Sequence, residues 1–328
     1  DSTVGKLDTI QLGAGIIASG VTLKRDGDSL VLTLNGSSDA LRVNGYFYED
    51  ATYGYQVEQI KFADGTIWNV NTVKAKVIAA SAGTDTLTGY ATNDTLSGLA
   101  GDDTIYARAG NDTLDGGAGE DQLYGEDGDD LIRGGTQNDR LDGGNGADNL
   151  QGQDGDDTLY GEDGNDTLDG GIGNDTLDGG AGNDTYMFGK GSGKDTISSY
   201  DSTVGKVDVI QLGSGVLTTD VVLKREGDTL VLSINGTNNI LRVNSYFSGD
   251  ATTGYQVEQI KFADGTIWDV NTVKTKVLTA TSENDTLTGY ASADTLSGLA
   301  GDDTVYAKAG NDTLDGGSGE DRLYGEDG

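Results

Sequence analysis

The stretch GGIGNDTLDGGAGNDTYMF, residues 170–188, decides the architecture of this chain. It contains the nine-residue phrase G-G-x-G-x-D-x-U-x twice, where U is an apolar residue, first at Leu177 and then at Tyr186. The phrase recurs in unbroken register in two arrays, at residues 80–190 and 280–328. A repeat of fixed length indicates one structural unit per phrase, stacked on its neighbours.

An aspartate stands at the sixth position of every repeat, and an apolar residue follows two positions later. The aspartates are Asp85, Asp94, Asp103, Asp112, Asp121, Asp130, Asp139, Asp148, Asp157, Asp166, Asp175 and Asp184 in the first array, and Asp285, Asp294, Asp303, Asp312 and Asp321 in the second. Such regularity cannot arise by chance. We therefore treat all of these aspartates as candidate metal ligands.

The chemistry of the phrase predicts a turn followed by a very short strand. Glycines in residues 170–175 permit positive φ and let backbone carbonyls converge, and the aspartate ends the turn. Residues 176–178 form the strand, whose central Leu177 points inward while its neighbours point outward. Two repeats then make one coil, so that leucines fill a narrow core and aspartates two repeats apart stack on one edge.

A stack of carboxylates and carbonyls suits calcium, a hard cation that takes several oxygen ligands in irregular geometry. Magnesium is less suited, because it demands a strict octahedron and short distances. Without the ion the stacked carboxylates repel one another. We therefore expect folding and calcium binding to be one event.

The repeats closely resemble the RTX (repeats-in-toxin) family of calcium-binding nonapeptides, as in GGAGEDQLY at 116 and GGIGNDTLD at 170. The resemblance implies an all-β fold with a right-handed parallel β-roll, a calcium-binding β-solenoid. It also implies a secreted, extracellular or cell-surface protein exported by type I secretion. If each ion needs two turns on one edge, the arrays would hold about 13 calcium ions.

Composition agrees with a cation-binding protein. Among 328 residues, 55 are acidic and 21 basic, for a formal charge of -34, which disfavours nucleic acid and anionic membranes. No cysteine or histidine is present, which excludes disulfides, thiolate metal sites and histidine-based catalysis. We expect neither an enzyme nor membrane insertion. The alternative for the 54 glycines is a disordered tract, which would hold without calcium.

A second, longer repeat has a period of 200 residues: DSTVGKLDTIQLGAG at position 1 returns as DSTVGKVDVIQLGSG at 201. Roughly three-quarters of the overlapping positions are identical. We predict a β-rich segment at 1–79, a roll of 12 nonapeptides at 80–190, a second β-rich segment at 191–279 and a roll of five at 280–328.

The β-rich segments are predicted from runs such as VTLKR and DSLVLTL and from the Asp64-Gly65 hairpin turn. Asn71 or Asn271 could cap a short helix, NTVKAKVIA or NTVKTKVLT. These segments resemble the haemolysin-type calcium-binding-related domain that accompanies RTX repeats.

Aromatic residues leave two alternatives open. Phe62, Trp68 and their counterparts in the second copy could form a sugar-stacking platform, or they could lie in the core. Tyr106, Tyr124 and Tyr160, at the outward ninth position, could form a contact stripe or pack against neighbouring strands of the roll.

Three functions remain open from sequence. The first is a structural extender of a large secreted or cell-surface RTX protein such as an adhesin, because tandem copies add length. The second is a secretion and folding module of an exported enzyme or toxin, and the third is a ligand-binding adhesin domain. The expected partners are calcium ions and neighbouring copies of the unit, with self-association into fibres or surface layers as a further possibility.

Overall fold

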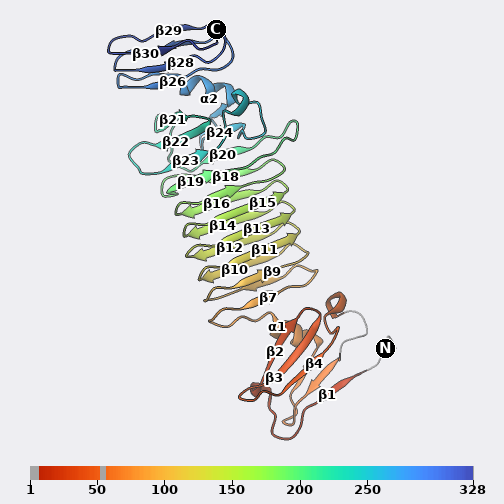
Figure 1. Cartoon of the computed structure of the whole chain (residues 1–328). Coiled ribbons are helices and arrows are strands. Elements are labelled where there is room, and N and C mark those ends of the chain that lie inside the picture. The colour runs from red at the N-terminus through yellow and green to blue at the C-terminus, as the bar shows by residue number, and fades with distance from the viewer. Residues whose placement is uncertain (1–6, 52–56, 328) are drawn as a thin grey trace.

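The chain forms an elongated stack of β-structure, with the first β-rich segment at one end and the second roll at the other (Figure 1). The structure is a computed structural model and describes residues 7–51 and 57–327. Within those residues, α-helix is confined to α1 (Val70–Val77) and α2 (Val270–Val277), with short 3-10 turns at Ala18–Gly20, Tyr48–Ala51 and Ser248–Asp250. The all-β class predicted from the sequence is confirmed.

The first roll consists of two parallel sheets. One contains β8 (Thr95–Ser97), β10 (Thr113–Ala118), β12 (Leu131–Thr136), β14 (Asn149–Asp154), β16 (Thr167–Ile172) and β18 (Thr185–Phe188). The other contains β7 (Thr86–Thr88), β9 (Thr104–Tyr106), β11 (Gln122–Asp127), β13 (Arg140–Asn145), β15 (Thr158–Asp163), β17 (Thr176–Asp178) and β19 (Lys194–Ile197). Leu114 lies beside Ile132 and Leu123 beside Leu141, one coil apart. This register confirms the parallel solenoid.

A single column of apolar side chains from each sheet forms the core of the roll. Leu96, Leu114 and Leu150 are fully buried, as are their counterparts on the facing sheet. The core is continuous from Leu87 through Tyr186 into the second β-rich segment. Since each repeat contributes one large apolar side chain, the roll buries little hydrophobic surface for its length.

Strands in the middle of the roll are longer than the sequence predicted. We expected three residues per strand, but β10 to β16 each have six. The pairing continues into the first part of each turn, where Gly117 lies opposite Gly135. Gly117 has φ 103°, a value open to glycine, and this conformation keeps the turn backbone in register with the next coil.

The second β-rich segment extends both sheets of the roll. It comprises β20 (Val209–Leu212), β21 (Val221–Glu226), β22 (Thr229–Ile234), β23 (Ile240–Val243), β24 (Gln259–Lys261) and β25 (Ile267–Asp269). β20 pairs in parallel with β18, and β23 pairs in parallel with β19. The roll and the segment after it are therefore joined by continuous nine- and ten-stranded sheets.

The first β-rich segment repeats this arrangement, but among the described residues no strand of a roll pairs with its sheets. Its strands are β1 (Thr9–Gln11), β2 (Val21–Asp26), β3 (Ser29–Leu34), β4 (Ala40–Val43), β5 (Gln59–Lys61) and β6 (Ile67–Asn69), in two three-stranded sheets. The second roll contains β26 (Thr286–Thr288), β27 (Thr295–Ser297), β28 (Thr304–Tyr306), β29 (Thr313–Asp315) and β30 (Arg322–Tyr324), again paired in parallel.

Both predicted helices are present, but the predicted caps are wrong by two residues. Asn69 lies just before α1 with an extended backbone, and its side chain accepts a hydrogen bond from the Thr72 N–H at 2.9 Å. Asp269 does the same for α2. Asn71 and Asn271 lie inside the first turn, where a residue has helical backbone and cannot act as the N-cap.

Side chains, and not continuous sheets, hold each β-rich segment to the roll that follows it. Arg25 Nη1 donates to the Gly89 carbonyl at 2.8 Å, and Asp50 Oδ2 accepts the Ala91 N–H at 2.6 Å. Tyr90 donates from its hydroxyl to a carbonyl of α1. The second copy repeats these contacts through Arg225, Asp250 and Tyr290.

Phe62 and Trp68 are buried, with ring centroids 4.5 Å apart, so these rings belong to the core of the first segment. Tyr106 and Tyr124 stack on each other at 5.0 Å on the outer face of one sheet. Arg140 covers the ring of Tyr160 at 4.1 Å. These contacts favour the packing alternative for the tyrosines.

Candidate metal centre

The sixth-position aspartates lie in two columns, one on each edge of the first roll. We call them the edge columns. In each, one carboxylate oxygen, Oδ1, accepts the N–H of the aspartate two repeats earlier. Asp139 Oδ1 accepts from Asp121 at 2.8 Å, and Asp157 Oδ1 accepts from Asp139 at 2.7 Å. The first edge column contains Asp85, Asp103, Asp121, Asp139, Asp157 and Asp175, and the second contains Asp94, Asp112, Asp130, Asp148, Asp166 and Asp184.

The other carboxylate oxygen, Oδ2, is the feature that points to a ligand. It is buried with no hydrogen-bond partner in Asp103, Asp112, Asp121, Asp130, Asp139, Asp148, Asp157, Asp166, Asp175, Asp184, Asp303 and Asp312. A buried carboxylate oxygen without a partner is costly in free energy. Its repetition along both edges indicates that each of these oxygens is built to face a cation.

A backbone carbonyl shares the space in front of each Oδ2. A Cβ built on Gly152 would lie 2.3 Å from Asp157 Oδ2 and 2.5 Å from the Gly170 carbonyl oxygen. The same holds at Gly116, next to Asp121 Oδ2. Glycine at the first position therefore leaves room between a carboxylate and a carbonyl, and these are oxygen donors that calcium prefers. The residues present fit calcium.

Burial raises the pKa of the carboxyl groups in the middle of the roll. The pKa of Asp130, Asp139 and Asp166 rises to about 7, and that of Asp148 and Asp157 rises to about 6. Loss of hydration is the main cause, and nearby carboxylates add to it. The anionic form that calcium needs is therefore unfavourable until a cation lies next to it.

Within the described residues, no three His, Cys, Asp or Glu side chains converge on one point. Side-chain carboxylates approach each candidate site along a column, and the turn backbone supplies the neighbouring carbonyls. This is compatible with calcium, whose protein ligands include backbone carbonyls as well as carboxylates.

The first aspartate of each column has a different environment. Asp85 Oδ2 accepts the Ser81 N–H, and Asp94 Oδ2 accepts the Tyr90 N–H, both at 2.6 Å. Ser81 and Tyr90 occupy the second position of their repeats. In the later repeats, the residue at the second position has a positive φ, such as 76° at Leu99, and the aspartate Oδ2 receives no hydrogen bond from its N–H. The second roll repeats the pattern at Asp285 and Asp294.

Asp321 is the last sixth-position aspartate of the second roll, and its Oδ1 accepts the Asp303 N–H at 3.0 Å. Its side chain is less buried than those in the middle of the first roll.

Two further aspartates continue the columns and were missed in the sequence because their spacing breaks the period of nine. Asp195 Oδ1 accepts the Asp175 N–H at 3.1 Å, and Asp208 Oδ1 accepts the Asp184 N–H at 3.0 Å. Both are buried. A weak signal was present, since each aspartate is followed two positions later by an isoleucine, as in the repeats.

Lys206 ends the second edge column. Its ammonium lies 2.5 Å from Asp208 Oδ2 and 3.4 Å from Glu258 Oε1, and it donates to the Gln256 carbonyl at 3.0 Å. The Lys206 side chain is buried. The oxygen of Asp208 that corresponds to the unpaired oxygens of the column is therefore neutralised by the protein's own cation.

Comparison with known proteins agrees with this geometry. The family model of the RTX calcium-binding nonapeptide repeat matches overlapping stretches from 79 to 197 and from 277 to 328, together just over half of the chain. The model of the haemolysin-type calcium binding protein related domain matches residues 30–72 and 230–272.

A curated relative is the iron-regulated protein FrpA of Neisseria meningitidis serogroup C, which is 40% identical over 99 residues. The match covers 30% of this chain and only 9% of that relative. In the described part of the chain, neither helix is long and apolar enough to cross a membrane.

Proposed function

Because this chain belongs to the family of RTX calcium-binding nonapeptide repeat proteins, we propose that it is a calcium-stabilised structural extender of a large secreted or cell-surface protein. The proposal rests on the buried aspartate Oδ2 atoms that lack a hydrogen-bond partner along both edge columns. Calcium bound there would neutralise the carboxylates and link consecutive coils through their carbonyls.

The ions would be held by the aspartates whose Oδ2 lacks a partner. One ion for each of these twelve oxygens gives a count close to the value of about 13 expected from the repeats alone. Asp195 would add a carboxylate at the end of the first edge column. Asp85, Asp94, Asp285 and Asp294 were predicted ligands, and their turn hydrogen bonds favour a different role, as caps that begin each column.

The arrangement of the copies supports the extender role. Continuous sheets join the first roll to the segment after it, and side chains join that segment to the second roll. The segments and rolls of this chain follow one another in an elongated stack (Figure 1), and an added copy of the unit would lengthen that stack. We propose a non-enzymatic role, since the columns account for the paired carboxylates that might otherwise suggest acid-base catalysis.

A second candidate is a secretion and folding module, which would stay unfolded at low cytosolic calcium and fold outside the cell. The supporting observation is again electrostatic. Burial, and to a smaller extent the neighbouring carboxylates of the column, raises the pKa of the mid-roll aspartates, so their charged forms disfavour a folded roll without cations. This role is compatible with the first. Export by the type I route and a role in adhesion stay proposals that rest on family resemblance.

Small-angle scattering of the chain and of a version with one added unit separates the two candidates. An extender predicts that the maximum dimension in calcium grows by one unit length, of which the first roll contributes roughly 29 Å. It also predicts that chelation abolishes this growth. A calcium-triggered fold whose length does not grow with added units would leave only the folding module.

A further inference from the structure

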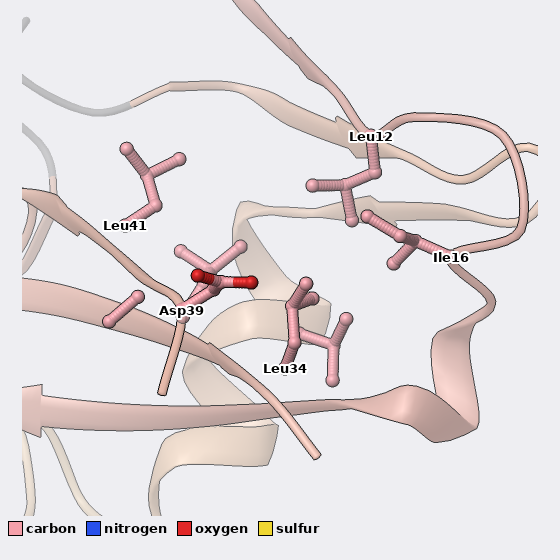
Figure 2. Close-up of a pocket in the computed structure, with 8 residues that line it drawn as sticks. Leu12, Ile16, Leu34, Asp39 and Leu41 are labelled. Carbon is pink, nitrogen blue, oxygen red and sulfur yellow. The ribbon is translucent and has the colours of Figure 1, made fainter. Parts of the chain in front are cut away.

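The first β-rich segment has an open apolar face at the place where the second segment is covered. Leu41 is 44% exposed, whereas its counterpart Leu241 is 1% exposed. Leu41 is one of the residues that line a pocket of about 180 Å³, together with Leu12, Ile16 and Leu34 among others (Figure 2). Leu41 and Leu241 are the same residue at the same place in the equivalent strands β4 and β23, so we trace the difference in their exposure to what lies against each strand.

In the second copy, the cover is the closing coil of the first roll, residues 184–199. Phe188 and Ile197 of that coil are buried and belong to the same apolar core as Leu241. The coil comes directly before the segment in the chain, and its strands β18 and β19 pair with β20 and β23.

Four backbone hydrogen bonds fix the closing coil on the second segment. The N–H groups of Val209 and Gly213 donate to carbonyls of Asp184 and Phe188 at 2.8 and 2.9 Å. The N–H groups of Ile240 and Asn244 donate to carbonyls of Gly193 and Ile197 at 2.9 and 3.0 Å. In the first segment, the amides at these positions are those of Thr9, Gly13, Ala40 and Asn44.

The first segment keeps the chemistry that this coil requires. Leu12 and Leu41 are identical to their counterparts, and Ile16 and Leu34 are replaced only by other aliphatic residues, valine and isoleucine. Two positions differ more. Ala40, which lines the pocket, stands where the second segment has Ile240. Asp39 stands where Asn239 donates to the Gly189 carbonyl, and a carboxylate cannot make that bond. An oxygen at this position can still accept the Gly193 N–H, as Asn239 Oδ1 does at 3.3 Å.

We propose that the face formed by β1, β4 and the pocket between them is a docking face for the closing coil of another nonapeptide roll. The occupant would have the sequence of residues 184–199. It would be carried by a further copy of the unit, joined ahead of this segment as residues 80–200 are joined ahead of residue 201. The occupied second segment is the template for this contact, and edge strands such as β4 are suited to accept a further strand.

The inference rests on the proposed extender role, because it specifies how successive units are joined. Docking of a roll would extend both three-stranded sheets of the first segment into a roll, as in the second copy. The roll and the segment after it would then be held together by strand pairing of their backbones as well as by side-chain contacts. An array of units would consist of continuous blocks, each made of a roll and the segment after it.

The test is amide hydrogen exchange, in calcium, on the full chain and on the same chain extended at its N-terminus by a copy of residues 80–200. The reporters are the amides of Thr9, Gly13, Ala40 and Asn44. We expect them to exchange faster than their counterparts in the second segment in the original chain. In the extended chain they should slow to the rates of those counterparts, which are measured in the same molecule.

A matched control carries Phe188→Asp and Ile197→Asp in the added copy only, so that the coil is present but cannot bury its side chains. This control should restore fast exchange at the four amides. Unchanged exchange in the extended chain would overturn the proposal, as would slow exchange in the original chain at high concentration, which would show two open faces paired with each other. Calcium-dependent folding of the rolls, followed separately by circular dichroism, tests the proposed function independently of this joint.

Discussion

Replacing Asp157 with alanine should destabilise the first roll far more than an equal loss of charge on its surface. Asp157 lies in the middle of the first edge column and is 1% exposed. Its Oδ1 accepts the Asp139 N–H at 2.7 Å, and its Oδ2 has no hydrogen-bond partner. The substitution therefore removes both a buried acceptor and a candidate calcium ligand.

The magnitude follows from these two losses. A buried N–H left without its acceptor costs about 1–3 kcal/mol. A cation site saturated about a hundredfold above its Kd contributes about 2.7 kcal/mol to the free energy of unfolding, which is lost with the site. Together the two losses lower the free energy of unfolding by about 4–6 kcal/mol, a large part of the roughly 5–15 kcal/mol that is typical of globular domains.

The assay is urea unfolding in calcium, followed by circular dichroism, with the number of bound ions measured by calorimetry. Asp154→Ala is the matched control, because Asp154 is exposed on the adjacent strand and its loss should cost less than about 0.5 kcal/mol. Asp321→Ala should fall between the two, since Asp321 is only half-buried. Equal losses of stability and of ions for all three variants would refute the edge columns and indicate independent loops.

Three further predictions concern the cation sites and the end of a column. The Gly152→Ala variant should bind calcium more weakly and be less stable, because its Cβ would lie 2.3 Å from Asp157 Oδ2. The control variant Gly13→Ala, whose Cβ would meet nothing within 4 Å, should bind calcium as the original chain does. Equal calcium titrations of the two variants would contradict this. Lys206→Met should cost about 3–5 kcal/mol in urea unfolding by leaving a buried carboxylate unpaired, against less than about 1 kcal/mol for the half-exposed Lys190→Met. As the pH falls from about 8 to about 6, the calcium concentration at the folding midpoint should rise, because burial raises the pKa of the mid-roll aspartates to about 6 or 7 and a proton must leave before calcium binds. In chelator, the free energy of unfolding should instead increase as the pH falls, since protonation of acids with raised pKa stabilises the folded state. A calcium midpoint that does not depend on pH would be inconsistent with buried carboxylate ligands.

The coiled fold of the rolls could be predicted from sequence, because the nine-residue period places an aspartate and an apolar residue at the same positions in every repeat. Leu177 and Asp175 have the same environment as the leucine and aspartate two repeats earlier, so one phrase describes every coil. The strand length could not be predicted. It depends on pairing between turn backbones, which is visible only when the coils are stacked.

The ends of the columns could not be predicted from the period, because they depend on residues that break it. Asp208 is 24 residues from Asp184 in sequence, and Lys206 is paired with it through a fold that also brings Glu258 to the same place. At the start, Asp85 has the same sequence position as every other ligand candidate, yet its second oxygen accepts a turn N–H. The conformation of the preceding residues decides this, and the aspartate itself carries no signal for it.

The most direct test of the account is a crystal structure in calcium with anomalous scattering measured to locate the ions. The account predicts two rows of calcium along the edges of the first roll, from Asp103 to Asp184, each ion about 2.3–2.6 Å from an aspartate Oδ2 and from turn carbonyls. Soaking with magnesium in place of calcium should leave these rows empty. Calcium on the outer faces of the sheets, or edge columns that hold no ion, would contradict the account.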